Sequence, residues 1–268
     1  MSGFQLAEQQ AHRYEAVTSV FMSGSAAILA TTSGLRAGDA VLDLACGTGL
    51  VARHAWPLVA TGGSVVGTDV NPAMLAVARA VAAERHALVE WFEAPADAQP
   101  FDDGCFDRVL CQQGLQFFAD PVAALAESMR VLTSGGQLHA TIWATPGHNP
   151  YIERQLAMLA ELDPALVPSL RAATPERADE SMLRWATEAG CADARIDLVE
   201  HTVPLTDVAA FFLQQTASTP WGPALAALGE ADRNLLVLDM AETLAPFRDL
   251  SGVHHVPFCS YRLTATAA

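Results

Sequence analysis

The chain has 268 residues and a formal net charge of −15, because 30 acidic residues outnumber 15 arginines and lysine is absent. Its length allows a full buried core, and 51% hydrophobic with 17% charged residues is typical of a soluble globular protein. The acidic balance argues against nucleic acid as a partner, and the missing lysine excludes a pyridoxal phosphate Schiff base and a P-loop.

The sequence gives no sign of a membrane or a metal. No apolar stretch is long enough to span a bilayer, and the N-terminus lacks the basic and apolar blocks of a signal peptide, so we expect a cytoplasmic protein. The five cysteines and eight histidines follow no metal-ligand spacing, which predicts reduced thiols and no metal site. A homodimer stays an open alternative to a monomer.

Residues 5–34 predict one or two helices, and from residue 40 onward short apolar runs alternate with helical patterns. Asn71-Pro72 and Asp120-Pro121 place a capping side chain before a proline at the first helical position, and Ser134-Gly135-Gly136 is expected to end a helix. Such alternation predicts a parallel sheet with helices on both faces. The expected strands are 40–45, 64–69, 88–93, 106–111 and 137–143, with helices at 50–60, 72–85 and 121–132.

The second half of the chain changes in character. Residues 150–190 are helical with proline breaks at 164, 168 and 175, and 207–250 are helical again. Strands are expected at 194–203 and 253–265, and these two can pair at one edge of the sheet. The expected fold is therefore α/β, a Rossmann-like, doubly wound, mostly parallel seven-stranded sheet with an antiparallel last strand, N-terminal helices and a helical substrate-cover insertion.

The sequence CGTGLVA after the first expected strand fits the nucleotide-binding pattern G-x-G-x-x-A at Gly47, Gly49 and Ala52. Asp69 ends the second expected strand, where a carboxylate can accept both hydroxyls of a ribose. Together these features leave a nicotinamide dinucleotide open, and a tight turn without a ligand gives the same glycine pattern.

Asp43 lies inside the first apolar run, four residues before Gly47. An ionised carboxylate there is costly unless it meets hydrogen-bond donors or a cation. A cofactor with a sulfonium and an ammonium group supplies such a cation. The compatible alternative is that Asp43 caps the following turn through its N–H groups.

The segments VLDLACGTG, VVGTDVNPAMLAVAR and APADAQPFDDGCFDRVLCQQGLQFFADPVAALAESMRVLTSGGQLHATIW follow in unbroken order between residues 36 and 145. Here the chain resembles the class I S-adenosylmethionine-dependent methyltransferases, in particular the small-molecule branch related to the ubiquinone and menaquinone C-methyltransferases. The resemblance fades after residue 150. It implies one methyltransferase domain over 1–268, made of an N-terminal helical cap (1–35), a cofactor-binding core (36–145) and substrate-cover helices with the last two strands (146–268).

The resemblance implies S-adenosylmethionine as the cofactor. Gly47 and Gly49 would line its methionine portion with Asp43 beside them. Asp69 would bind the ribose hydroxyls, and Met74 would pack against the adenine ring.

Four further residues match the family pattern. Asp97 would accept a hydrogen bond from the adenine amino group, with a solvated loop acid as the alternative. Cys111 and Gln112 would approach the amino end of the cofactor, and Tyr14 would close over its methionine end.

The acceptor side of the site is less defined by sequence. Gln116, Phe117 and Trp143 are the expected substrate contacts, whereas Leu115, Phe117 and Phe118 would equally form the core face of a short helix. Residues 150–250 are expected to cover the substrate. Their aromatic residues, Trp185, Phe211, Phe212 and Trp221, suit an apolar or aromatic acceptor and would also suit the core of a helical insertion.

The predicted reaction is methyl transfer to an O or C nucleophile of a small, largely apolar or aromatic metabolite, in natural-product or quinone biosynthesis. His148 is the first candidate for a catalytic base, followed by Tyr14, His12 and His201; a base is needed only for a protonated nucleophile. The alternatives are a cyclase or pericyclase that binds the same cofactor without transferring methyl, and a non-catalytic cofactor-binding protein. An NAD-dependent oxidoreductase is disfavoured because a Tyr/Lys hydride-site pair is absent.

Overall fold

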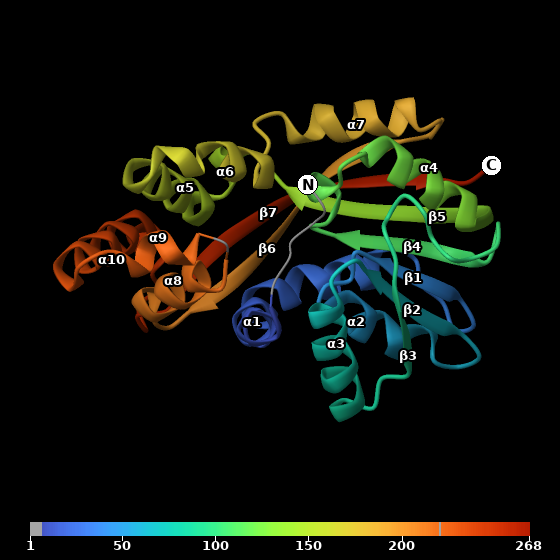
Figure 1. Cartoon of the computed structure of the whole chain (residues 1–268), viewed down its shortest axis with the longest axis horizontal. Coiled ribbons are helices and arrows are strands. Elements are labelled where there is room, and N and C mark those ends of the chain that lie inside the picture. The colour runs from blue at the N-terminus through green and yellow to red at the C-terminus, as the bar shows by residue number, and fades with distance from the viewer. Residues whose placement is uncertain (1–6, 220) are drawn as a thin grey trace.

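A single seven-stranded sheet runs through the structure, a computed structural model that describes residues 7–219 and 221–268 (Figure 1). The strand order is β3-β2-β1-β4-β5-β7-β6. The first five strands are parallel, β7 is antiparallel to β5, and β6 is antiparallel to β7. This confirms the predicted fold class. The strands are β1 (Ala40–Leu44), β2 (Ser64–Asp69), β3 (Val89–Glu93), β4 (Phe106–Gln112), β5 (Leu132–Trp143), β6 (Arg195–Leu205) and β7 (His254–Thr266).

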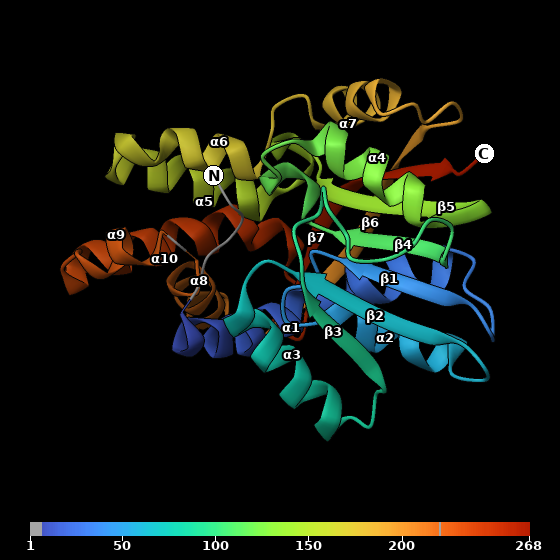
Figure 2. The same ribbon diagram turned by 45° about the vertical axis from the view of Figure 1, so that its right-hand side comes forward.

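The helices form three groups around the sheet (Figures 1 and 2). One face is covered by α1 (Glu8–Thr32), α2 (Leu50–Val59) and α3 (Pro72–Glu84), and the other by α4 (Pro121–Val131) and α7 (Ala178–Glu188). The third group extends beyond one end of the sheet and consists of α5 (Pro150–Leu162), α6 (Val167–Ala173), α8 (Val208–Ala217), α9 (Gly222–Ala226) and α10 (Glu230–Leu244). Residues 5 and 6 of the expected N-terminal helix, and the first six of the expected cap, lie outside the described residues.

The alternation of side chains along β1 decides which face each residue serves. Val41 packs in the cluster formed with α1 and α2, whereas Leu42 and Leu44 pack in the cluster on the α4 and α7 face. Successive strand residues point to opposite faces, so Asp43 points to the same side as Val41. The alternation along β1 therefore places the Asp43 side chain on the face that α2 covers.

Two expectations on boundaries are corrected. Helix α4 ends at Val131, and Ser134–Gly136 belong to β5 rather than ending the helix. The cause is pairing with β4, since Phe106 pairs with Leu132 while Arg108 already pairs with Gln137, and the extra residues bulge out. Pro168 does not break a helix; it lies in the first turn of α6, where its missing N–H costs no helical bond.

The third helical group has a hydrophobic core of its own. Phe211 and Phe212 of α8 are buried there against Tyr151 and Phe258, and Phe21 of α1 joins the same cluster. Trp185 of α7 packs against the core cluster on the α4 and α7 face of the sheet. Three of the four aromatic residues expected in the cover therefore serve packing.

Within the described ranges, no helix combines the length and the apolar character needed to cross a bilayer.

Candidate functional site

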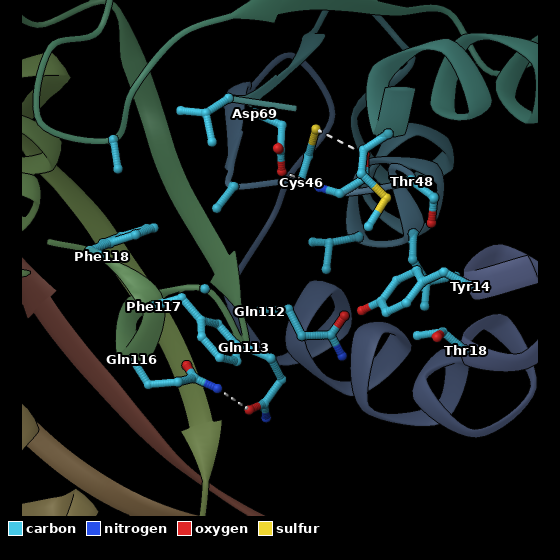
Figure 3. Close-up of a pocket in the computed structure, with 18 of the residues that line it drawn as sticks. Tyr14, Thr18, Cys46, Thr48, Asp69, Gln112, Gln113, Gln116, Phe117 and Phe118 are labelled. Atoms are coloured by element: carbon cyan, nitrogen blue, oxygen red, sulfur yellow. Dashed lines mark hydrogen bonds between the residues drawn. The ribbon is translucent and has the colours of Figure 1, made fainter. Parts of the chain in front are cut away.

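A cavity of about 380 Å³ opens at the carboxyl ends of the parallel strands, beside the reversal of strand order between β1 and β4 (Figure 3). It is bounded by the strand-end loops on one side and by α1 and the third helical group on the others. Ten of the residues expected from sequence line it: Tyr14, Asp43, Gly47, Asp69, Met74, Asp97, Gln112, Gln116, Phe117 and Trp143. Gly49, Cys111 and His148 do not line it.

Asp43 is buried, with 1% of its surface exposed. Its Oδ2 accepts a hydrogen bond from the backbone N–H of Ala52 at 2.8 Å, so the side chain caps the first turn of α2 from the neighbouring strand. Burial raises the pKa of this carboxyl to about 7, with a smaller contribution from the charge of Asp69. The capping alternative is therefore present, and the carboxylate still faces the cavity.

Asp69 links the ends of two strands. Its Oδ2 accepts from the N–H of Gly47 and its Oδ1 from the N–H of Asn71, both at 2.8 Å. Burial raises its pKa above the ordinary value, and these amide hydrogen bonds oppose that shift. The carboxylate thus fixes the glycine loop while one side of it lines the cavity.

The two glycines of the motif have different roles. Gly47 has φ +54, and a Cβ added to it would meet nothing within 4 Å, so the backbone leaves room for a ligand. Gly49 has φ +78, and its Cβ would lie 2.2 Å from the Trp91 ring. Gly49 is therefore needed for packing of the loop on β3, which explains why it does not reach the cavity.

Helix α1 is fastened over the site by polar contacts with the start of α2. Glu15 forms a 2.7 Å ion pair with Arg53, whose side chain is only 4% exposed, and the Thr48 hydroxyl donates to the other Glu15 oxygen. These contacts hold the neighbouring Tyr14 against the cavity. Burial raises the pKa of Tyr14 to about 12, so the phenol keeps its proton at neutral pH.

The next two strand ends supply Met74 and Asp97. Asn71 caps α3 by accepting from the N–H groups of Ala73 and Met74, which fixes the first turn and places the buried Met74 at the cavity. Asp97 lies in the loop after β3 and is exposed, so its carboxylate is at the solvent-facing rim.

Three glutamines lie at the end of β4 and in the turn after it. Gln112 Nε2 donates to Ser25 Oγ of α1 at 2.7 Å, Gln113 Nε2 donates to Ser260 Oγ of β7 at 2.9 Å, and Gln116 Nε2 donates to Gln113 Oε1 at 3.2 Å. Figure 3 shows Gln113 and Gln116 across the cavity from Asp69. Cys111 is buried, and burial raises its pKa to about 12.

The short turn after these glutamines divides the roles that sequence left open. Leu115 is 1% exposed and packs in the core, and Phe117 lines the cavity. Phe118 does both, since it lines the cavity and packs against the same core cluster as Leu115. Sequence reasoning missed Thr18 and Phe21 of α1, Thr219, and Gln215 of α8, all of which line it too. No local motif marks these residues; a helical pattern alone does not tell which face meets a cavity.

The four candidates for a base are not brought together. His148 is exposed and its ring lies edge-on to Tyr261, with ring centroids 6.2 Å apart. His12 is exposed on α1, and His201 is buried with Nε2 3.0 Å from the Phe21 carbonyl oxygen. Of the four, Tyr14 alone lines the cavity among the described residues.

The charges around the cavity have one sign. Four carboxylates line it, those of Asp43, Asp69, Asp97 and Asp120, and no arginine or histidine does so in the described part of the chain. In that same part, no three His, Cys, Asp or Glu side chains are grouped so as to hold a metal ion.

Residues 42–140 match a family model described as a methyltransferase domain. An uncharacterized protein of Mycobacterium tuberculosis is 36% identical over 134 residues, which are 50% of this chain and 48% of that protein. The ubiquinone/menaquinone biosynthesis C-methyltransferase UbiE of Xylella fastidiosa is 43% identical over 108 residues, which are 40% of this chain and 43% of that enzyme. The matched segment thus spans a little under half the length of these curated relatives.

Solved structures share the fold. Phosphoethanolamine N-methyltransferase 2 of Haemonchus contortus, in complex with S-adenosyl-L-methionine, has a TM-score of 0.61 at 20% identity over 98% of this chain and 58% of that one. The cyclase SpnF has a TM-score of 0.55 at 18% identity over 100% of both chains. At these identities the likeness is one of fold.

Proposed function

We propose that this chain, which belongs to the class I S-adenosylmethionine-dependent methyltransferases and is related to UbiE, transfers methyl from S-adenosylmethionine to an O or C nucleophile of a small, largely apolar or aromatic metabolite. The single observation that carries the proposal is the buried Asp43 carboxylate between the start of α2 and the cavity. The similarity to UbiE supports quinone or natural-product biosynthesis as the setting.

The lining residues fit a cationic cofactor better than a dinucleotide. In dinucleotide folds the pyrophosphate binds the first helix N-terminus. Here Asp43 already accepts the Ala52 N–H of that helix, and Asp69 accepts the N–H of Gly47. Negative charge added there would meet carboxylates without a lining cation to offset them, whereas a sulfonium and an ammonium group would be attracted.

The other cofactor contacts are assigned on the same basis. Asp69 would take the ribose hydroxyls, Met74 would pack on the adenine, and Asp97 at the rim would accept from the adenine amino group. The backbone of Gly47 would approach the methionine portion, and Gln112 the amino end. Gly49 and Cys111 would support this loop and strand from behind.

When bound, the cofactor supplies an activated methyl group on a positively charged sulfur. The task of the chain is then to align the acceptor and to exclude water. Phe117, Trp143 and Trp221 line the cavity and offer apolar surface for this. Tyr14 keeps its proton, and no histidine among the described residues reaches the cavity. Because Asp43 and Asp69 are assigned above to the cofactor, we expect an acceptor that is nucleophilic without a dedicated protein base.

Isothermal titration calorimetry with S-adenosylmethionine and with NADH tests the cofactor. We expect saturable binding of S-adenosylmethionine and none of NADH at equal concentration. Tighter binding of NADH would overturn the proposal.

Turnover separates methyl transfer from its rivals. A set of phenolic and enolic metabolites is incubated with the protein and cofactor carrying a ¹³C-labelled methyl group. Labelled product and equimolar S-adenosylhomocysteine support the proposal. A rearranged product with the cofactor unconsumed would identify a cyclase of the kind that SpnF represents, with which the fold is shared.

A further inference from the structure

We propose that the methyl acceptor carries a neutral carbonyl oxygen that accepts a hydrogen bond from the side-chain amide of Gln215, so that this residue of α8 determines substrate specificity. The proposal rests on the proposed function, because it names the substrate class of the same cavity. Aryl ketones and quinones are molecules of this class.

The first observation concerns the direction of the Gln215 amide. Its Oε1 accepts from the Tyr151 hydroxyl at 3.1 Å and from Gln155 Nε2, and these two residues of α5 are only 1% and 3% exposed. Gln155 Nε2 also donates to Thr216 Oγ1 at 2.8 Å, which holds it in place. The oxygen of the Gln215 amide is thus fixed toward the buried contact between α5 and α8. Because the nitrogen lies on the other branch of the planar amide, Nε2 is directed away from that contact.

The second observation is that Gln215 Nε2 is an unused donor. In the described part of the chain no acceptor takes a hydrogen bond from it, and it is not among the enclosed polar atoms that lack a partner. The side chain lines the cavity. A donor that is oriented and accessible can bind a ligand oxygen without first losing an internal hydrogen bond.

The other amides of the cavity differ from Gln215 in this respect. Three further lining amides already donate from Nε2 to internal acceptors: Gln112, Gln113 and Gln116. The indole N–H of Trp221 likewise donates to Ser169 Oγ at 3.1 Å. Among the lining amides that the structure describes, the nitrogen of Gln215 is therefore the one left for a ligand.

The third observation is the aromatic surface next to Gln215. Phe211 lies one helical turn before it on α8 and packs edge-on against Phe21 of α1, with ring centroids 5.6 Å apart. Phe21 in turn stacks with Trp143 at 6.4 Å, and both of these rings line the cavity. They suit the ring system of an aryl ketone or quinone. The indole N–H of Trp143 is also unpaired among the described residues, which makes it the rival donor.

The fourth observation is the sign of the charge. The charged residues in the described lining are all acidic: Asp43, Asp69, Asp97 and Asp120. A carboxylate on the acceptor would lose water there without gaining a cation, whereas a carbonyl oxygen carries no charge. The cavity therefore favours a neutral oxygen as the partner of Gln215.

Three probes of similar shape test the proposal: 2-acetylnaphthalene, 2-isopropenylnaphthalene, in which a CH₂ group replaces the carbonyl oxygen, and 2-naphthoate. Their dissociation constants are measured at pH 8 on the full chain saturated with S-adenosylhomocysteine. Gln215→Glu keeps an oxygen for Tyr151 and Gln155 but replaces Nε2 with a second oxygen. Gln214→Glu adds the same charge at an exposed neighbour on α8 that does not line the cavity.

Wild type and Gln214→Glu should bind the ketone about tenfold more tightly than the alkene, and should bind naphthoate more weakly than the ketone. Gln215→Glu should lose the preference for the ketone over the alkene, because an oxygen then faces the carbonyl oxygen. Continued binding of S-adenosylhomocysteine and of the alkene shows that the variant is folded.

A second measurement needs no variant. The infrared difference spectrum between complexes of unlabelled and ¹³C=O-labelled 2-acetylnaphthalene isolates the carbonyl band of the bound ketone. A carbonyl that accepts a hydrogen bond absorbs at lower frequency. We therefore expect the band of the ketone bound to wild type at lower frequency than in hexane, and this band decides the outcome if Gln215→Glu does not fold.

A preference for the ketone that persists in Gln215→Glu would assign the contact to another donor, such as Trp143, and overturn the proposal. An alkene bound as tightly as the ketone, naphthoate bound more tightly, no ketone binding, or a carbonyl band at its hexane frequency would also overturn it. Each of these results leaves binding of S-adenosylhomocysteine intact. A chain that binds no S-adenosylhomocysteine would overturn the proposed function and this proposal with it.

Discussion

The Asp43 carboxylate accepts a hydrogen bond from the Ala52 N–H at 2.8 Å, so a residue of β1 caps the helix that follows the glycine loop. One contact thereby serves two purposes. It secures the turn after β1, and it keeps a carboxylate at the cavity in surroundings that disfavour its charge. A ligand that brings positive charge relieves that penalty, and this makes binding depend on pH.

Affinity for S-adenosylmethionine should increase as pH rises through about 7. Burial raises the pKa of Asp43 to about 7, so the free protein carries a protonated Asp43 below that pH, and a cationic ligand must displace the proton. A cation that requires the ionised form loses about tenfold in affinity between pH 8 and pH 6. Calorimetry across this range measures the effect.

Asp43→Asn provides the control, because its amide oxygen can still accept from Ala52 while the titrating group is gone. Affinity should change less with pH in the variant than in the wild type. The ligand's own amino group titrates equally in both experiments, so the difference between the two slopes reports Asp43 alone. Parallel slopes in the two proteins would contradict the assignment of Asp43 to the cation.

Asp69→Ala should weaken the binding of S-adenosylmethionine by about 1–3 kcal/mol, through lost charge-assisted hydrogen bonds. The structure adds a second effect, because the N–H groups of Gly47 and Asn71 lose their acceptor, so the free energy of unfolding should fall as well. Calorimetry and urea unfolding measure the two. Asp102→Ala, in an exposed loop outside the cavity, should change neither, and an unaltered dissociation constant in Asp69→Ala would refute the ribose contact.

Substituting the two glycines of the motif should have different effects: Gly49→Ala on the stability of the fold and Gly47→Ala mainly on cofactor binding. Gly49→Ala puts a Cβ 2.2 Å from the Trp91 ring at a residue with φ +78. We expect its free energy of unfolding to fall by about 2–4 kcal/mol. Gly47→Ala meets no atom within 4 Å and should cost about 1 kcal/mol of stability, while its methyl group enters the cavity and weakens cofactor binding. Urea unfolding measures both losses, and a larger loss of stability in Gly47→Ala than in Gly49→Ala would contradict these roles.

Local patterns in the sequence were sufficient for one half of the site. Asp43 lies within one short apolar run and Asp69 ends the next. Because the carboxyl ends of parallel strands lie at one edge of the sheet, the fold class alone predicts that these two carboxylates are close together. The acceptor side depends on contacts between distant segments. Gln116 donates to Gln113, and Gln113 donates to Ser260 on the last strand; no pattern within residues 112–118 encodes the contact with Ser260.

The position of His148 also depends on a contact between distant segments that its local sequence does not encode. Its place after β5 predicts the ligand-bearing end of the sheet, and its short turn does lie there. Asn149 decides its direction, because the buried Asn149 amide donates to the carbonyl oxygens of Ala144 and Cys259 and accepts from the Cys259 N–H at 2.7 Å. This anchors the loop to β7 and leaves His148 outside, against Tyr261.

His139 of β5 should make the protein sensitive to mild acid. It is 4% exposed, and burial, aided by the charges of Arg262, Arg108 and Arg195, lowers its pKa to about 4. The folded chain therefore keeps His139 neutral where the unfolded chain binds a proton, so its contribution to stability is complete above about pH 6.5 and is lost as pH falls toward 4. Between pH 7 and pH 5 the loss should be about 2 kcal/mol. Urea unfolding of wild type and His139→Gln at both pH values measures this loss of unfolding free energy. Every other group titrates in both proteins, so the difference between them reports His139. An equal loss in the two proteins would rule out His139 as the source.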